Sequence, residues 1–180
     1  MQQLQKKLGR EVIPIQVPIG EEQKFCGVID LVHLKAFQFP ADESGQALEV
    51  PIPTDLEDEV EAARSQLVEM VAEQDEALLE KFFAEGTLSE ADLAEGLAKA
   101  TAARKVFPLV YCSGGRNLGV LPLMDILVTL VPNPLTVAFS ARNLAGDELE
   151  LQPKPDDTPI AYVFKTISDP YAGRITILRV

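Results

Sequence analysis

The sequence predicts an α/β fold, α+β overall, in which a piece of parallel sheet carries an inserted antiparallel sheet and a group of acidic helices. Three observations predict it. An apolar run at 106–111 continues through a Ser-Gly-Gly turn into an amphipathic helix that stops at Pro132. Short strand-like runs at 12–51 precede three helical segments. After Pro132 the chain becomes strand-like again, with polar turns.

The first fifty residues predict a short helix and a small antiparallel unit. Residues 1–8 are compatible with the last two turns of a helix that stops at Gly9. Val12–Ile19 alternates like one strand, and its prolines suggest an edge position. Phe25–Phe39 supplies two more strand-like runs, and 47–51 a further one.

The first of three acidic helices is expected behind the tetrapeptide Thr54-Asp-Leu-Glu57, which has the pattern of a capping box. Apolar residues then recur at spacings of three and four, which is typical of one buried helix face. They are Val60, Ala63, Leu67, Met70 and Val71.

Two further helices follow. The second is expected over about 76–83, with Gly86 ending it. The third runs to about residue 102, and either Thr87 or Ser89 can cap its start.

The last third of the chain predicts strands. Gly146-Asp147 and 153–157 read as turns. Strands are expected at Ile160–Ile167 and Arg174–Val180, joined by a turn at 168–173. A two-stranded ribbon is only marginally stable unpaired, so we expect more strands to follow Arg174–Val180.

Composition limits the function. The net charge of −12 argues against broad nucleic-acid binding through composition alone, because neutralising phosphates requires an excess of Lys and Arg, and we expect no DNA partner. Residues 41–100 hold 17 Asp or Glu against Arg64, Lys81 and Lys99. Helix faces so rich in charge are usually solvated, or dock a basic partner, rather than forming an acid–base or metal site. We therefore expect no metal ligands.

The remaining signals point to a cytoplasmic protein. Cys26 and Cys112 form neither a disulfide framework nor a metal-binding spacing. No apolar run is long enough to cross a membrane, and the polar start does not resemble a signal peptide. We expect no membrane partner.

Catalysis by Cys112 or Ser113 would require a base, and the single histidine, His33, lies in a strand-like apolar run with no partner pattern. We therefore expect no catalytic residue, and we expect Cys112 to be a buried structural residue.

Asp42-Glu-Ser-Gly45 matches the Asp-x-x-Gly pattern of nucleotide switches, but no phosphate loop precedes it, and we interpret it as a hairpin turn. The turn at Ser113-Gly114-Gly115 either packs tightly or contacts a ligand.

Taken in order, the segments resemble elongation factor G and its close paralogues among the translational GTPases. The resemblance spans essentially the whole chain. It rests on Leu8-Gly9, Ile13–Gly20, Phe25–Leu31 with Lys35-Ala36, Cys112–Val120, Pro132–Pro134, and Phe164–Val180. In that family the segment matching Cys112–Val120 is the fifth guanine-nucleotide motif, normally Gly-Ser-Ala followed by Lys-Asn-x-Gly-Val.

The resemblance implies that Ser113, Gly114 and Gly115 form the guanine-side turn, where the Gly114 N–H can donate to the guanine O6. Gly114 stands where the family has Ala, and Gly115 replaces a larger residue, which resembles a paralogue more than the main factor. The family's phosphate loop, magnesium-binding threonine and Asn-Lys-x-Asp clamp would precede Met1. The full-length parent is expected to bind GTP with Mg²⁺, whereas this chain alone is expected neither to hold nor to hydrolyse it.

The resemblance also implies a domain plan. Residues 1–24 would be the carboxyl-terminal part of a P-loop GTPase domain, 25–104 its inserted subdomain, 105–132 the domain's last strand, turn and helix, and 133–180 the linker and first strands of a β-barrel domain. The chain would be an interior fragment of a ribosomal factor. Its acidic subdomain would face the ribosomal stalk protein, and its second domain small-subunit ribosomal RNA. The alternative is a standalone interaction module that uses the acidic helices.

Overall fold

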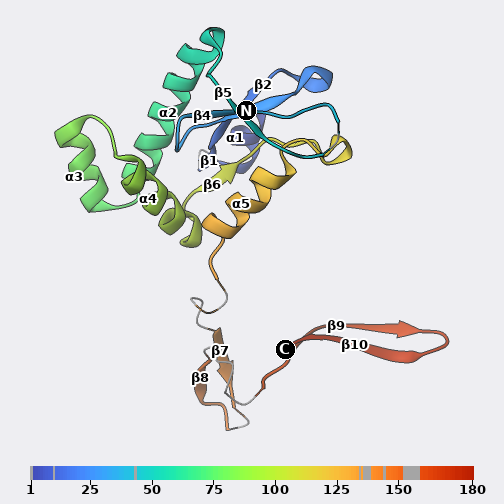
Figure 1. Ribbon diagram of the computed structural model, residues 1–180. Helices are drawn as coiled ribbons and strands as arrows, with labels where there is room; N and C mark the ends of the chain where they lie inside the picture. Colours follow the sequence, from blue (N-terminus) through green and yellow to red (C-terminus); the bar gives the residue numbers. More distant parts are fainter. Residues whose placement is uncertain are drawn as a thin grey trace. The chain divides into compact units, whose positions relative to one another are not determined.

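The structure is a computed structural model that describes residues 2–9, 11–42, 44–133, 135, 139–143, 145–151 and 159–180. The chain forms two compact units, Met1–Pro132 and Asn133–Val180. The predicted mixed α/β class is confirmed, because a small parallel sheet, antiparallel sheets and several helices are all present. Figure 1 shows the elements of each unit.

The described part of the first unit contains two sheets. In the parallel one, β1 (Val12–Pro14) pairs with β6 (Phe107–Leu109). The antiparallel sheet has the order β2-β3-β4-β5. Its strands are β2 (Gln16–Ile19), β3 (Gly27–Asp30), β4 (Lys35–Gln38) and β5 (Leu48–Val50).

The single strand expected at Val12–Ile19 is instead two strands in two sheets. Ile15 lies at the crossing point, where its N–H donates to the Leu109 carbonyl at 3.1 Å and its own carbonyl accepts from the Leu31 N–H at 3.0 Å. One residue therefore joins the parallel sheet to the antiparallel sheet. Both polar backbone groups of Ile15 have a partner, as a buried segment requires.

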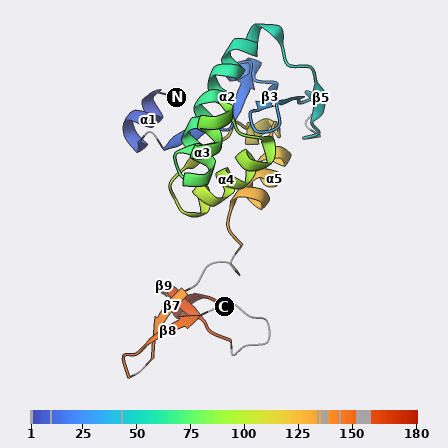
Figure 2. The same ribbon diagram turned by 90° about the vertical axis from the view of Figure 1, so that its left-hand side faces the viewer.

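Five helices complete the first unit within the residues that the structure describes. They are α1 (Gln2–Leu8), α2 (Glu57–Ala72), α3 (Glu76–Glu85), α4 (Glu90–Ala102) and α5 (Val120–Leu130). Figure 2 shows α2, α3 and α4 gathered beside one another. Among the described residues, no helix combines the length and the apolar character that a membrane crossing demands.

One apolar core joins the sheets to these helices. Leu67 and Val71 of α2 and Leu93 and Leu97 of α4 pack with strand residues such as Ile13. Leu67 and Leu93 are fully buried, with 0% of their surface exposed. The strands at 12–17 and the helices at 57–102 therefore share a single core rather than two separate ones.

Side chains cap the starts of α3 and α4, whereas the start of α2 differs from the sequence prediction. Asp75 caps α3, and its side chain accepts hydrogen bonds from the N–H groups of Ala77 and Leu78. Ser89, and not Thr87, caps α4. The capping box expected at Thr54–Glu57 is wrong, because Thr54–Leu56 form a 3₁₀ turn after Pro53, and α2 begins without a side-chain cap.

This difference gives a paired prediction. We expect Asp75→Ala to lower the free energy of unfolding by about 0.5–2 kcal/mol, because two helix amides lose their acceptor. Thr54→Ala should change it by less than about 0.5 kcal/mol, as an exposed residue without such a role does. Urea denaturation of both variants checks this, and a larger loss for Thr54→Ala would restore the capping box.

Among its described residues, the second unit contains two antiparallel pairs. One joins β7 (Phe139–Arg142) to β8 (Glu148–Leu151), and the other joins β9 (Tyr162–Asp169) to β10 (Gly173–Arg179). The turn that closes the longer ribbon covers 170–172 and is shorter than the expected 168–173, because β9 extends to Asp169 and β10 begins at Gly173. The Asp169 side chain accepts from the Tyr171 and Ala172 N–H groups. Met1, Glu43, Pro134 and the expected turn at 153–157 lie outside the described residues.

Candidate functional site

The Ser-Gly-Gly turn, residues 113–115, follows β6 beyond the carboxyl end of the parallel pair (Figure 1). Two hydrogen bonds continue the pairing toward it. The Ile15 N–H donates to the Leu109 carbonyl at 3.1 Å, and the buried Gln16 side chain accepts from the Tyr111 N–H at 3.2 Å. Ligands of α/β proteins bind at this end of parallel strands, which makes the turn the first candidate site.

The turn is the start of a small closed loop. The Ser113 N–H donates to the Leu118 carbonyl at 2.8 Å, and the Leu118 N–H returns a bond to the Ser113 carbonyl at 3.0 Å. Inside the loop, the Asn117 N–H donates to the Gly114 carbonyl at 3.2 Å, with Asn117 in the left-handed region at φ 52°. The loop therefore has a defined shape rather than an arbitrary one.

An apolar anchor holds the far end of this loop. Leu118 is buried with Phe25, Val28 and Phe39 in a second, smaller core cluster. The next residue, Gly119, begins α5 at φ 74°, and a Cβ there would lie 3.0 Å from the Tyr111 carbonyl oxygen. Glycine is thus required where the helix starts close to the strand end.

Gly114 and Gly115 are exposed. Within the part of the chain that the structure describes, their N–H groups donate no hydrogen bond. No atom lies within 4 Å of the position that a Cβ would occupy at either residue. Because both residues are exposed and their N–H groups have no partner among the described residues, these two donors are available to a carbonyl oxygen or an anion.

We expect Gly114→Ala to raise the free energy of unfolding by about 0.4–1 kcal/mol. The native backbone there is outside the left-handed region and the site has room for a methyl group, so alanine mainly restricts the unfolded chain. Thermal denaturation checks this. A loss of stability would show that the turn requires glycine for its own fold.

Two expectations about reactive side chains are wrong. Cys112 is exposed rather than buried, because the chain leaves the sheet before it reaches the turn. His33 lies in the tight turn between β3 and β4 rather than in a strand, and it has a partner: its Nδ1 lies 2.8 Å from Asp30 Oδ2. His33 and Cys112 lie on different elements, and none of the described contacts joins their side chains.

The loop containing Asp42 joins β4 to β5, so it connects two antiparallel strands as expected of a hairpin. The Asp42 carboxylate accepts from the Ser44 N–H at 3.1 Å. Hydrogen bonds from Ser44 lower the pKa of Asp42 below its ordinary value. The carboxylate thus stabilises its own loop.

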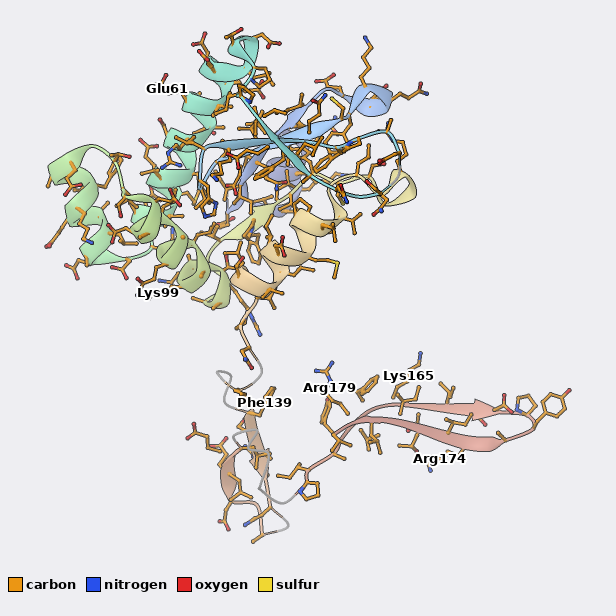
Figure 3. The ribbon with its side chains drawn as sticks, viewed as in Figure 1. Glu61, Lys99, Phe139, Lys165, Arg174 and Arg179 are labelled. Carbon is orange, nitrogen blue, oxygen red and sulfur yellow. The ribbon has the colours of Figure 1, made fainter. Side chains whose placement is uncertain are left out.

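The acidic residues of α2, α3 and α4 are mostly exposed, as Glu61 on α2 is (Figure 3). Some pair with the few bases nearby: Lys81 with Asp92, and Lys99 with Glu95, both at 2.6 Å. The hydrogen bond that Lys81 donates to Asp92 raises the pKa of Lys81, and the same bond lowers the pKa of Asp92. Most carboxylates remain available to an outside partner. Among the described residues, no group of three or more His, Cys, Asp or Glu is arranged to hold a metal ion.

An open groove of about 690 Å³ lies along α2. Glu57, Glu61 and Glu69 line it together with apolar Val60 and Phe82. Arg64, also in its wall, donates to the carbonyls of Leu31 and Val32 and so fixes α2 to the β3–β4 turn. The lining of the groove combines apolar side chains with negative charge, which suits an amphipathic basic partner.

Sequence reasoning missed Arg116, which lies next to the turn. Its guanidinium donates to the carbonyls of Gln23 at 3.0 Å and of Glu22 and Phe25 at 3.2 Å each. It also lies 3.5 Å from Ser113 Oγ. The carbonyl partners are more than 90 positions away, so no local pattern indicates them.

No family model matches the chain. Among solved structures, the chain is similar to the crystal structure of ttk003000868 from Thermus thermophilus, with a TM-score of 0.72 and 28% sequence identity. The match covers 99% of this chain but 24% of the other protein. The chain therefore spans about a quarter of the length of the protein that it resembles.

Proposed function

We propose that the chain is a section of a ribosome-associated translational GTPase that resembles elongation factor G, and that it contributes the guanine side of the nucleotide site. The observation that carries the proposal is the Ser-Gly-Gly turn, whose two glycine N–H groups have no partner among the described residues and lie beyond the carboxyl end of a parallel strand pair. The likeness to a protein about four times as long supports it, since that likeness extends over 99% of this chain.

The residues present fit one half of a guanine nucleotide. The Gly114 N–H is free to donate to the guanine O6, and this contact needs no particular side chain. The 180 residues contain no Gly-x-x-x-x-Gly-Lys-Ser/Thr loop and no Asn-Lys-x-Asp clamp, so they do not fit the triphosphate or its Mg²⁺. The chain alone should therefore neither retain GTP nor hydrolyse it.

The proposal also assigns two ribosomal partners in the cytoplasm. The exposed carboxylates of the helices suit a basic surface, consistent with the stalk protein. In the second unit, β9 and β10 carry Lys165, Arg174 and Arg179 against a single acid, Asp169, which suits small-subunit ribosomal RNA (Figure 3).

The groove along α2 favours a second candidate, a standalone interaction module without nucleotide chemistry. Reading the coding sequence upstream of Met1 separates the two. The proposed function expects an in-frame segment that carries a phosphate loop and an Asn-Lys-x-Asp motif. A stop codon directly upstream, with no such segment, would rule out the proposed function and favour the standalone interaction module.

A further inference from the structure

The loop between β2 and β3 presents three carbonyl oxygens to a single side chain. Glu22–Lys24 form a 3₁₀ turn, with Glu22 in the left-handed region at φ 50°. The carbonyl oxygens of Glu22, Gln23 and Phe25, here called the carbonyl cup, all accept from the Arg116 guanidinium. A planar fork of five N–H donors suits such a cup, whereas an ammonium group is a single donor centre.

The carbonyl cup is itself held firmly. The Lys24 N–H donates to the Glu21 carbonyl at 2.9 Å, and the Cys26 N–H to the Ile19 carbonyl at 3.0 Å, which closes the loop at its base. The Phe25 side chain is buried in the same cluster as Leu118. Arg116 therefore bonds to a rigid partner and not to a mobile one.

The Ser-Gly-Gly turn requires an anchor such as the hydrogen bonds from Arg116 to the carbonyl cup. Its two glycines have no side chain to pack, so within the loop only backbone hydrogen bonds, such as that from the Asn117 N–H to the Gly114 carbonyl, restrain them. Leu118 anchors the far end of the loop through apolar contacts. Arg116, directly after the two glycines, is the side chain that ties this loop to the β2–β3 loop.

We propose that Arg116 is the positioning residue of the Ser-Gly-Gly turn: it holds the two free N–H groups in place by bonding to the carbonyl cup, and so couples the β2–β3 loop to the guanine-binding edge. The role at guanine rests on the proposed function. The coupling itself does not, because it is a property of the hydrogen bonds within this chain.

Amide hydrogen exchange, followed by NMR on the full 180-residue chain without nucleotide, tests the coupling. In Arg116→Ala, the amides of Ser113 and Leu118 should exchange at least about tenfold faster, since hydrogen bonds from a charged donor are among the stronger ones. The amides of Leu67 and Val71 in the core should keep their rates. Arg116→Lys should recover only part of the protection.

Arg104→Ala is the matched control. Arg104 is exposed, and its side chain makes no hydrogen bond or ion pair among the described residues, so all four amides should keep their rates. Unchanged turn amides in Arg116→Ala, or turn and core amides that accelerate by the same factor, would overturn the proposal. Because no nucleotide is used, this experiment can fail or succeed independently of the proposed function, which the coding sequence upstream of Met1 tests.

Discussion

Leu67→Ala is expected to lower the free energy of unfolding of Met1–Pro132 by about 2–5 kcal/mol. Leu67 is fully buried at the centre of α2, where it belongs to the core cluster that also includes Ile13 and Val106. Truncation leaves a cavity that the packed neighbours can only partly fill. Because helices and strands share that core, amides of the parallel pair β1–β6 should lose protection together with those of α2.

The control is Leu127→Ala, which removes the same atoms from the middle of α5, where 51% of the residue is exposed. Its cost should be less than half that of Leu67→Ala, since much less contact is lost. Denaturant unfolding with exchange measurements checks both. If Leu67→Ala loosened α2 alone and left β1 and β6 protected, the single shared core would be wrong.

Gly20→Ala is expected to produce the second large effect. Gly20 has φ 78°, and a Cβ there would lie 2.2 Å from the Lys24 carbonyl oxygen. The left-handed conformation alone costs a residue other than glycine about 1–3 kcal/mol. The clash adds to this, because the atom in the way belongs to the backbone and cannot rotate aside. The loop would have to shift, and the carbonyl cup with it.

Gly86→Ala separates these two costs. Gly86 has a similar φ of 72° at the end of α3, but no atom lies within 4 Å of its Cβ position. It should therefore show the conformational cost without the clash. Thermal unfolding of both variants measures the difference. Equal losses would show that the loop at 20–25 can move freely, which would contradict its role as a rigid partner of Arg116.

Elements with complete local signals were predictable from the sequence. The helix α5 is bounded by Gly119 and Pro132, and the ribbon β9–β10 by strict alternation around one turn. The division of Val12–Ile19 was not predictable. Its two halves alternate alike, and only the distant partners of Ile15, the Leu109 carbonyl and the Leu31 N–H, place them in different sheets.

The candidate site shows the same limit. The position of Ser113–Gly115 between a strand and a helix follows from local pattern, and the structure places it there. The hydrogen bonds by which Arg116 positions this turn do not follow from local pattern, because their acceptors are carbonyls of the β2–β3 loop that only folding brings near. Apolar neighbours likewise suggest a buried Cys112, although the backbone carries it to the surface.

We propose that this chain keeps the guanine edge of a nucleotide site and that its 180 residues lack the part that binds phosphate and magnesium. Titration of the 180-residue protein with a fluorescent GTP analogue, with and without Mg²⁺, tests it most directly. We expect no saturable binding in the micromolar range under either condition, because contacts to the phosphates and the metal provide most of the affinity for such a nucleotide. Micromolar binding that depends on Mg²⁺ would contradict the claim.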